Sequence, residues 1–130
     1  MRLLLDTHVW IWRLLAPERL SDEAERVIAD RESMLHLSPI SAWETLVLAR
    51  KGRLSLKPSP AAWVLDALRR SALTTVPLSH GIALRSEALD GFEAIDPADR
   101  FLVATAIEHE LVLISADSAI RGFEPVQTLW

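Results

Sequence analysis

Residues 1–15, MRLLLDTHVWIWRLL, decide the fold of this chain. They begin with a continuous apolar run that ends at Asp6, and such a run predicts a buried strand. A helix from about Thr7 to Leu15 is expected to follow, with Thr7 as its cap and Pro17 beyond its end. A strand that passes directly into a helix is typical of a parallel sheet, because the chain must cross over before it can form the next strand.

The same alternation of strands and helices continues to the end of the chain. Further strands are predicted at MLHLS (34–38), LVLIS (111–115) and, at an edge, PVQTL (125–129), and TTVPL (74–78) is predicted as a strand or an extended link. Further helices are predicted at 22–32, 39–51, 60–72, 79–89 and 96–110. The pattern predicts an α/β fold whose mostly parallel sheet is covered on both faces. The linker-like segment LSLKPSP (54–60) is too short to divide the chain, so we expect residues 1–130 to form a single domain.

Composition restricts the classes of function. The chain has a net charge of −4 and no cysteine, which excludes thiolate metal sites and argues against broad, non-specific binding to nucleic acid. No apolar run approaches the roughly 20 residues that cross a bilayer, and no leader precedes the first strand, so we expect a cytoplasmic protein. A mean hydropathy of +0.19 predicts an apolar surface patch for a subunit or partner.

Four carboxylates stand where a parallel sheet would bring them together. Asp6 ends the first strand, Asp117 follows the strand LVLIS, and Glu44 and Asp99 open two helices. The carboxyl ends of parallel strands share one edge, where the following helices begin. Carboxylates gathered there repel one another, so either their pKa values rise or a divalent cation lies between them. We interpret the set as a metal site.

Each acid also has a purely structural interpretation. Asp6 could cap the first helix, and Glu44 could fold back in a capping box. Asp117 could cap the turn after it, and Asp99 could favour the positive end of a helix that Asp96 caps. Four acids at four junctions on one edge favour the metal site over four unrelated caps.

Four stretches of the chain resemble the PIN domain family, specifically the VapC-type toxins of VapBC type II toxin–antitoxin pairs. They are LLLDTHVWIW (3–12), SAWETLVLARKGRL (41–54), DPADRFLVATA (96–106) and LVLISAD (111–117), in the family's order. The resemblance implies a three-layer α/β/α sandwich with a sheet of about five parallel strands. It also implies an endoribonuclease that depends on Mg²⁺ or Mn²⁺, with Asp6, Glu44, Asp99 and Asp117 as the metal-binding and catalytic acids. The partners it implies are RNA, an antitoxin protein and a second copy of the chain.

Two positions depart from the family's pattern. Relatives often have His before the Asp-Pro pair and Phe after it, where this chain has Ile95 and Ala98. The differences touch the loop and not the acids, so they bear on the choice of substrate more than on activity.

Basic residues that could bring a negatively charged substrate to the acidic site have two interpretations. Arg53 and Lys57 follow the Glu44 helix and are candidates for contacts to RNA phosphates, although such charges can equally form a solvated surface. Two other functions use the same acids. One is a metal-dependent DNA or flap nuclease, or a phosphohydrolase, and the other is a non-catalytic pocket for a basic peptide.

Other polar and aromatic residues are assigned supporting roles. His8 is expected to form a structural hydrogen bond, and the hydroxyls of Ser115 and Thr105 could support the acids. Trp10 and Trp12 lie about 200° apart around their helix, so one should meet another surface, from which we expect a homodimer. The remaining tryptophans are assigned to the core or its edge: Trp43, Trp63 and Trp130.

Overall fold

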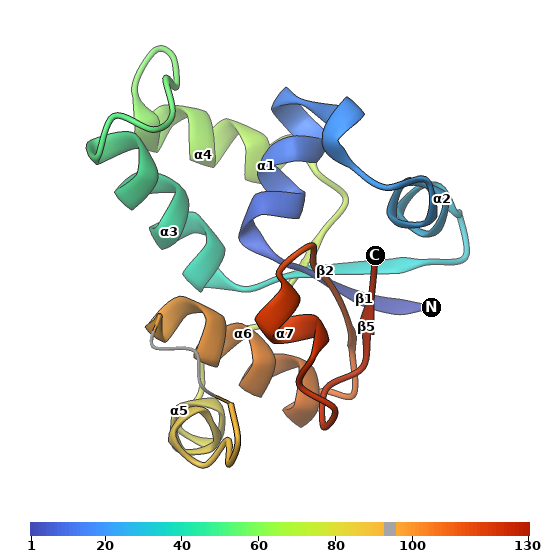
Figure 1. Ribbon diagram of the computed structural model, residues 1–130. Helices are drawn as coiled ribbons and strands as arrows, with labels where there is room; N and C mark the ends of the chain where they lie inside the picture. Colours follow the sequence, from blue (N-terminus) through green and yellow to red (C-terminus); the bar gives the residue numbers. More distant parts are fainter. Residues whose placement is uncertain (93–95) are drawn as a thin grey trace.

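The computed structural model describes residues 1–92 and 96–130 and contains a five-stranded parallel sheet of order β3-β2-β1-β4-β5 (Figure 1). The strands are β1 (Arg2–Leu5), β2 (Met34–Leu37), β3 (Thr74–Thr75), β4 (Val112–Ile114) and β5 (Thr128–Leu129). The helices are α1 (Thr7–Leu15), the 3₁₀ turn η1 (Pro17–Arg19), α2 (Asp22–Ala29), α3 (Pro39–Arg50), α4 (Pro60–Arg70), α5 (His80–Glu87), α6 (Pro97–Glu108) and α7 (Ser118–Arg121). The predicted α/β class and the parallel sheet are confirmed.

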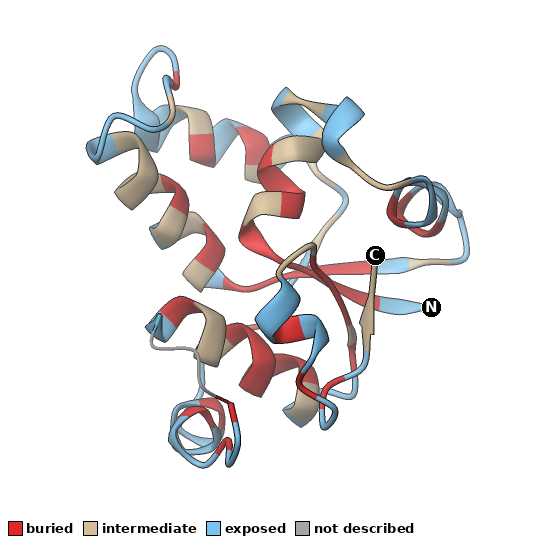
Figure 2. Ribbon diagram, in the orientation of Figure 1, coloured by how far each residue is buried: buried red, intermediate tan, exposed pale blue. Residues whose placement is uncertain are grey.

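Strand β1 lies at the centre of the sheet and supplies both halves of the core. Leu3 and Leu5 point to the side covered by α1, α2 and α4, and Leu4 points to the side covered by α5, α6 and α7. All three leucines are fully buried, and Figure 2 shows β1 as buried along most of its length. The uninterrupted apolar run is therefore the signature of a strand covered on both faces.

The two edge strands are shorter than the sequence predicts. In the segment TTVPL, Thr74 and Thr75 pair with β2, and the N–H of Val76 still donates to the carbonyl of Leu37 at 3.0 Å. Pro77 then has no backbone N–H with which to continue the ladder. In PVQTL only Thr128 and Leu129 pair with β4. None of the helices in the described ranges is long and apolar enough to span a bilayer.

One tryptophan, Trp43, is more exposed than the sequence predicts. Trp10 is fully buried, and Trp12 turns to the other side of α1, where its ring packs 5.9 Å from that of Trp130. The second surface that Trp12 meets is thus part of the same chain. Trp63 and Trp130 are half-buried, as expected, but Trp43 is 51% exposed.

Helix α3 begins at Pro39, as predicted, and this start explains the exposed Trp43. Ser38 caps the helix and Pro39 is its first residue, so the buried positions are Ser41 and Thr45, one turn apart. The hydroxyls of these two residues are hydrogen-bonded, Ser41 accepting from Thr7 at 2.9 Å and Thr45 donating to the Ser41 carbonyl at 2.7 Å. Small, internally satisfied polar residues therefore form the buried stripe, and Trp43 faces outward.

Candidate metal centre

Asp6 is the most constrained of the acids at the carboxyl edge of the sheet. It is 2% exposed, and its Oδ1 accepts from the backbone N–H of Thr7 at 2.7 Å. Asp6, not Thr7, therefore caps α1, which corrects the predicted cap. Its Oδ2 accepts from Ser115 Oγ at 2.6 Å and lies 3.4 Å from Nδ1 of His8. Burial raises the pKa of Asp6, and His8, Ser115 and the Thr7 N–H oppose that rise.

Asp117 reaches the same edge from the end of β4. Its Oδ1 accepts from the backbone N–H of Ile120 at 3.0 Å, so it caps α7 as the structural interpretation expects. Ser115 joins it to Asp6, because the Ser115 hydroxyl donates to Asp6 and accepts from the backbone N–H of Asp117 at 3.1 Å. The predicted support from Ser115 is confirmed. The predicted support from Thr105 is wrong, since that hydroxyl donates to the carbonyl of Phe101.

Glu44 lies in the second turn of α3 and does not open it. The capping box that pairs it with Ser41 is wrong, because Ser38 takes the cap by accepting from the N–H of Ile40. Glu44 is half-buried and faces the acids of the neighbouring elements. Burial raises its pKa, and the charges of Asp6 and Asp96 add to the effect.

Asp96 and Asp99 stand together at the start of α6. Asp96 caps the helix by accepting from the N–H of Ala98 at 2.9 Å, as predicted. One carboxylate oxygen each from Glu44, Asp96 and Asp99 lies within 4.8 Å of the other two. The sequence analysis assigned Asp96 to capping alone and missed this second position. Its spacing of three residues from Asp99, which places both on one side of the helix, was the available signal.

The other predicted acids all lie near enough to Asp99 for their charges to act on it. Its pKa rises to about 7, first because the carboxyl is buried and then because of four negative neighbours: Asp6, Asp96, Asp117 and Glu44. A carboxylate that resists ionisation in this way lies in a concentration of negative charge. The donor set consists of carboxylate oxygens, which fits a hard divalent cation with oxygen ligands.

Other predicted residues lie at different distances from this centre. His8 accepts from the N–H of Ala116 through Nε2 at 3.0 Å, so its structural hydrogen bond is confirmed, and it also contacts Asp6. Arg53 and Lys57 are exposed in the connection between α3 and α4, beyond the end of α3 that lies away from the acids (Figure 1). Of the two departures from the family pattern, Ile95 lies outside the described residues, and Ala98 is fully buried.

The fold and its acidic centre agree with a family comparison. The model of the PIN domain family matches residues 3–124. The chain belongs to the PIN domain family. Within this family, it is 34% identical over 130 residues to "Ribonuclease VapC22" of Mycobacterium tuberculosis, with 98% of this chain and 97% of the relative covered.

Solved structures reproduce the PIN arrangement of strands and helices. VapBC2 from Rickettsia felis, bound to a DNA fragment from its promoter, aligns with a TM-score of 0.73 at 15% identity, over 99% of this chain and 98% of that chain. A toxin–antitoxin complex from Klebsiella pneumoniae aligns with a TM-score of 0.65 at 25% identity, over 95% of this chain and 94% of that chain. FitAcB from Neisseria gonorrhoeae aligns with a TM-score of 0.66 at 23% identity, over 100% of this chain and 97% of that chain.

The raised pKa of Asp99 predicts how stability depends on pH without metal. The unfolded chain loses this proton at about pH 3.9 and the folded protein at about pH 7, so ionisation of Asp99 weakens folding progressively between these values. Asp99→Asn removes this pH-dependent loss of stability, because asparagine does not ionise. We expect the variant to gain free energy of unfolding over the wild type on going from about pH 5 to about pH 8, measured by urea unfolding in EDTA.

Asp90→Asn is the matched control, because Asp90 is an exposed acid outside the cluster. A difference between Asp99→Asn and the wild type that stays the same at both pH values would contradict the electrostatic account.

Proposed function

We propose that this protein is a metal-dependent endoribonuclease and the toxin of a toxin–antitoxin pair. The observation that carries the proposal is that Asp6, Glu44 and Asp117 lie near Asp99 at one edge of a PIN domain, close enough for their charges to add to the rise that burial causes in the pKa of Asp99. The relative named a ribonuclease supports RNA as the substrate. Mg²⁺ or Mn²⁺ is the proposed ion, because both accept carboxylate oxygens.

The residues that would hold the ion are already positioned by their own hydrogen bonds. Asp6 is fixed by Ser115 and the start of α1, and Asp117 by the start of α7, while Glu44, Asp96 and Asp99 form the tightest group of oxygens. A bound divalent ion would polarise the scissile phosphate and lower the pKa of an attacking water. Asp99 contributes as a ligand only after it loses its proton, so we expect ion binding to weaken below about pH 7.

Asp6→Asn tests the assignment of the acids. Asn caps a helix about as well as Asp, so the variant should fold, but it removes one charge from the centre. We expect metal-dependent cleavage of RNA to fall by at least about 10²-fold. The measurement is cleavage of structured and single-stranded RNA, with DNA of the same sequence and EDTA as parallel reactions, and circular dichroism to verify folding. Normal cleavage by Asp6→Asn would exclude the mechanism, and cleavage of DNA alone would favour the alternative nuclease.

Arg53 and Lys57 remain proposed contacts to RNA outside the cleavage centre. Both are exposed, and both lie beyond the far end of α3 from the acids. Reversal of both charges should weaken RNA binding. The slope of log affinity against log salt concentration (the salt slope) should fall by up to about 1.4, at about 0.7 per phosphate contact. The value of kcat should not change, because both residues lie away from the acids. The measurement is RNA affinity in EDTA at several salt concentrations. An unchanged slope would assign both residues to the solvated surface.

The proposed protein partner is a cognate antitoxin. The solved relatives include toxin–antitoxin complexes, and an acidic centre of this kind attracts a basic side chain. Co-expression with the reading frame that neighbours this one tests the proposal, because an antitoxin from that frame must bind the protein and inhibit cleavage.

A homodimer is the second proposed assembly, and we propose that it forms through a surface of α3 and α6 instead of α1. A hollow of about 600 Å³ is lined by apolar side chains, including the exposed Trp43 and Leu78. The full lining is Pro39, Ile40, Trp43, Leu78, Pro97 and Phe101. Exposed apolar patches of this kind mark sites of protein association.

We expect the wild type to sediment as a dimer at micromolar concentration and Leu78→Glu to sediment as a monomer. Leu84→Glu is the matched control, because Leu84 is 75% exposed on α5 and does not line the hollow. A monomeric wild type, or equal behaviour of the two variants, would remove this proposal.

A further inference from the structure

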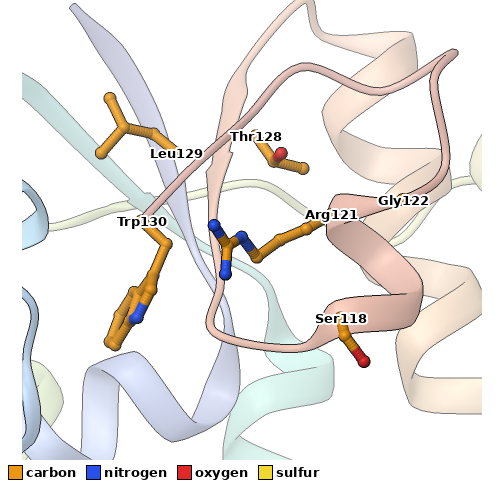
Figure 3. Close-up of a pocket in the computed structure, with 6 residues that line it drawn as sticks. All are labelled: Ser118, Arg121, Gly122, Thr128, Leu129 and Trp130. Atoms are coloured by element: carbon orange, nitrogen blue, oxygen red, sulfur yellow. The ribbon is translucent and has the colours of Figure 1, made fainter.

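A second pocket lies on the other side of the acidic centre, between α7 and β5. Its volume is about 570 Å³, and it is lined by Ser118, Arg121, Gly122, Thr128, Leu129 and Trp130 (Figure 3). The lining combines one guanidinium, two hydroxyls and one indole ring. Among residues 1–92 and 96–130, no acidic side chain lines it.

Two features place the pocket near the acidic centre. Asp117 caps α7, and the next residues of that helix, Ser118 and Arg121, line the pocket. The ring of Trp130 lies 6.4 Å from that of His8, and His8 in turn lies 3.4 Å from Asp6. The four residues from Asp117 to Arg121 advance about 6 Å along a helix, so the pocket lies within one or two nucleotides of the acids.

Three aromatic rings form a continuous ledge beside this pocket. His8 lies 4.8 Å from Trp12, and Trp12 lies 5.9 Å from Trp130, measured between ring centroids. The guanidinium of Arg19 stacks over Trp12 at 4.2 Å, and Arg121 lines the same pocket as Trp130, so a cation lies beside two of the three rings. Aromatic rings interleaved with cations are the usual platform for single-stranded nucleic acid.

Arg121 is positioned to accept an anion from outside the molecule. It is exposed, and within residues 1–92 and 96–130 it forms no ion pair. Figure 3 shows its side chain extending from α7 toward Trp130. A planar guanidinium beside hydroxyl groups suits a phosphate, which it can bind through two parallel hydrogen bonds.

The charge of the surroundings favours a cation close to the place where the RNA backbone would lie. The chain carries a net charge of −4, and five carboxylates gather at the centre itself. Phosphates on either side of the cleaved bond are repelled by these carboxylates, and Arg121 is a cation placed to offset that repulsion.

We propose that the pocket and the ledge of His8, Trp12 and Trp130 bind single-stranded RNA next to the bond that is cut. Arg121 binds a phosphate, with the hydroxyls of Ser118 and Thr128 lining the same pocket, and Trp130 stacks on an unpaired base. Bases must be unstacked from a duplex to lie on aromatic side chains, so the site selects single-stranded segments. This inference rests on the proposed ribonuclease function.

The decisive comparison is between Arg121→Glu and Arg31→Glu. Arg31 is also exposed and unpaired within the described ranges, and it lies before β2, at the opposite edge of the sheet from the acids. The two variants change the net charge equally, so long-range repulsion is the same in both. Binding of a fluorescent single-stranded oligoribonucleotide in EDTA is measured at several salt concentrations, and kcat/KM is measured with Mg²⁺.

We expect Arg121→Glu to lose roughly tenfold or more in affinity and to lower the salt slope by about 0.7, while Arg31→Glu leaves the slope unchanged. Arg121→Lys should keep the slope, because the charge remains. Trp130→Ala should weaken binding about 5- to 100-fold without changing the slope, and Trp130→Phe should restore most of the loss. Thermal melting verifies that both Trp130 variants are folded.

The outcomes separate this inference from the proposed function. If the wild type cleaves RNA with Mg²⁺ and Arg121→Glu behaves like Arg31→Glu, the inference is wrong and the function stands. Loss of binding to a protein partner with unchanged RNA affinity would make the pocket a protein-docking surface and overturn the inference. If the wild type does not cleave RNA at all, the proposed function itself fails.

Discussion

Repulsion among carboxylates at one edge of a parallel sheet is the constraint on which this structure depends. The central position of β1 brings Asp6 beside the end of β4, where Asp117 follows. Three of the acids also cap helices, Asp6 at α1, Asp96 at α6 and Asp117 at α7, so the positive ends of those helices offset part of the repulsion. The fold thereby holds a concentrated negative charge that is available to a divalent ion.

The surfaces on the two sides of this centre differ in character. Toward α3 and α6 the neighbouring surface is an apolar hollow that includes Trp43, whereas toward α7 and β5 it is a pocket with Arg121 and Trp130. The first suits association with protein, and the second suits a phosphate and a base. An enzyme that acts on a charged polymer and is also regulated by protein contacts needs both kinds of surface, and here they border a single cluster of acids.

The sequence predicted the fold well where one residue pattern had one explanation. The apolar run of β1 and the Asp-Pro start of α6 could each form only one kind of element, and both were confirmed. The start of α3 at Pro39 was predicted correctly, but the place of Glu44 was wrong. Ser38 and Ser41 are equally good caps, and the choice of Ser41 turned Trp43 inward and Glu44 to the helix start. The pocket of Arg121 was not predictable, since only tertiary structure brings the last strand beside α7.

The double use of the acids as caps has an evolutionary consequence. Asn satisfies the N–H groups at a helix start about as well as Asp does, so a single base change that converts one of these acids to its amide removes charge but preserves the architecture. Descendants that have lost their chemistry can therefore persist as well-folded decoys. Such decoys would still present the same outer surfaces and could sequester the partners of an active copy in the same cell.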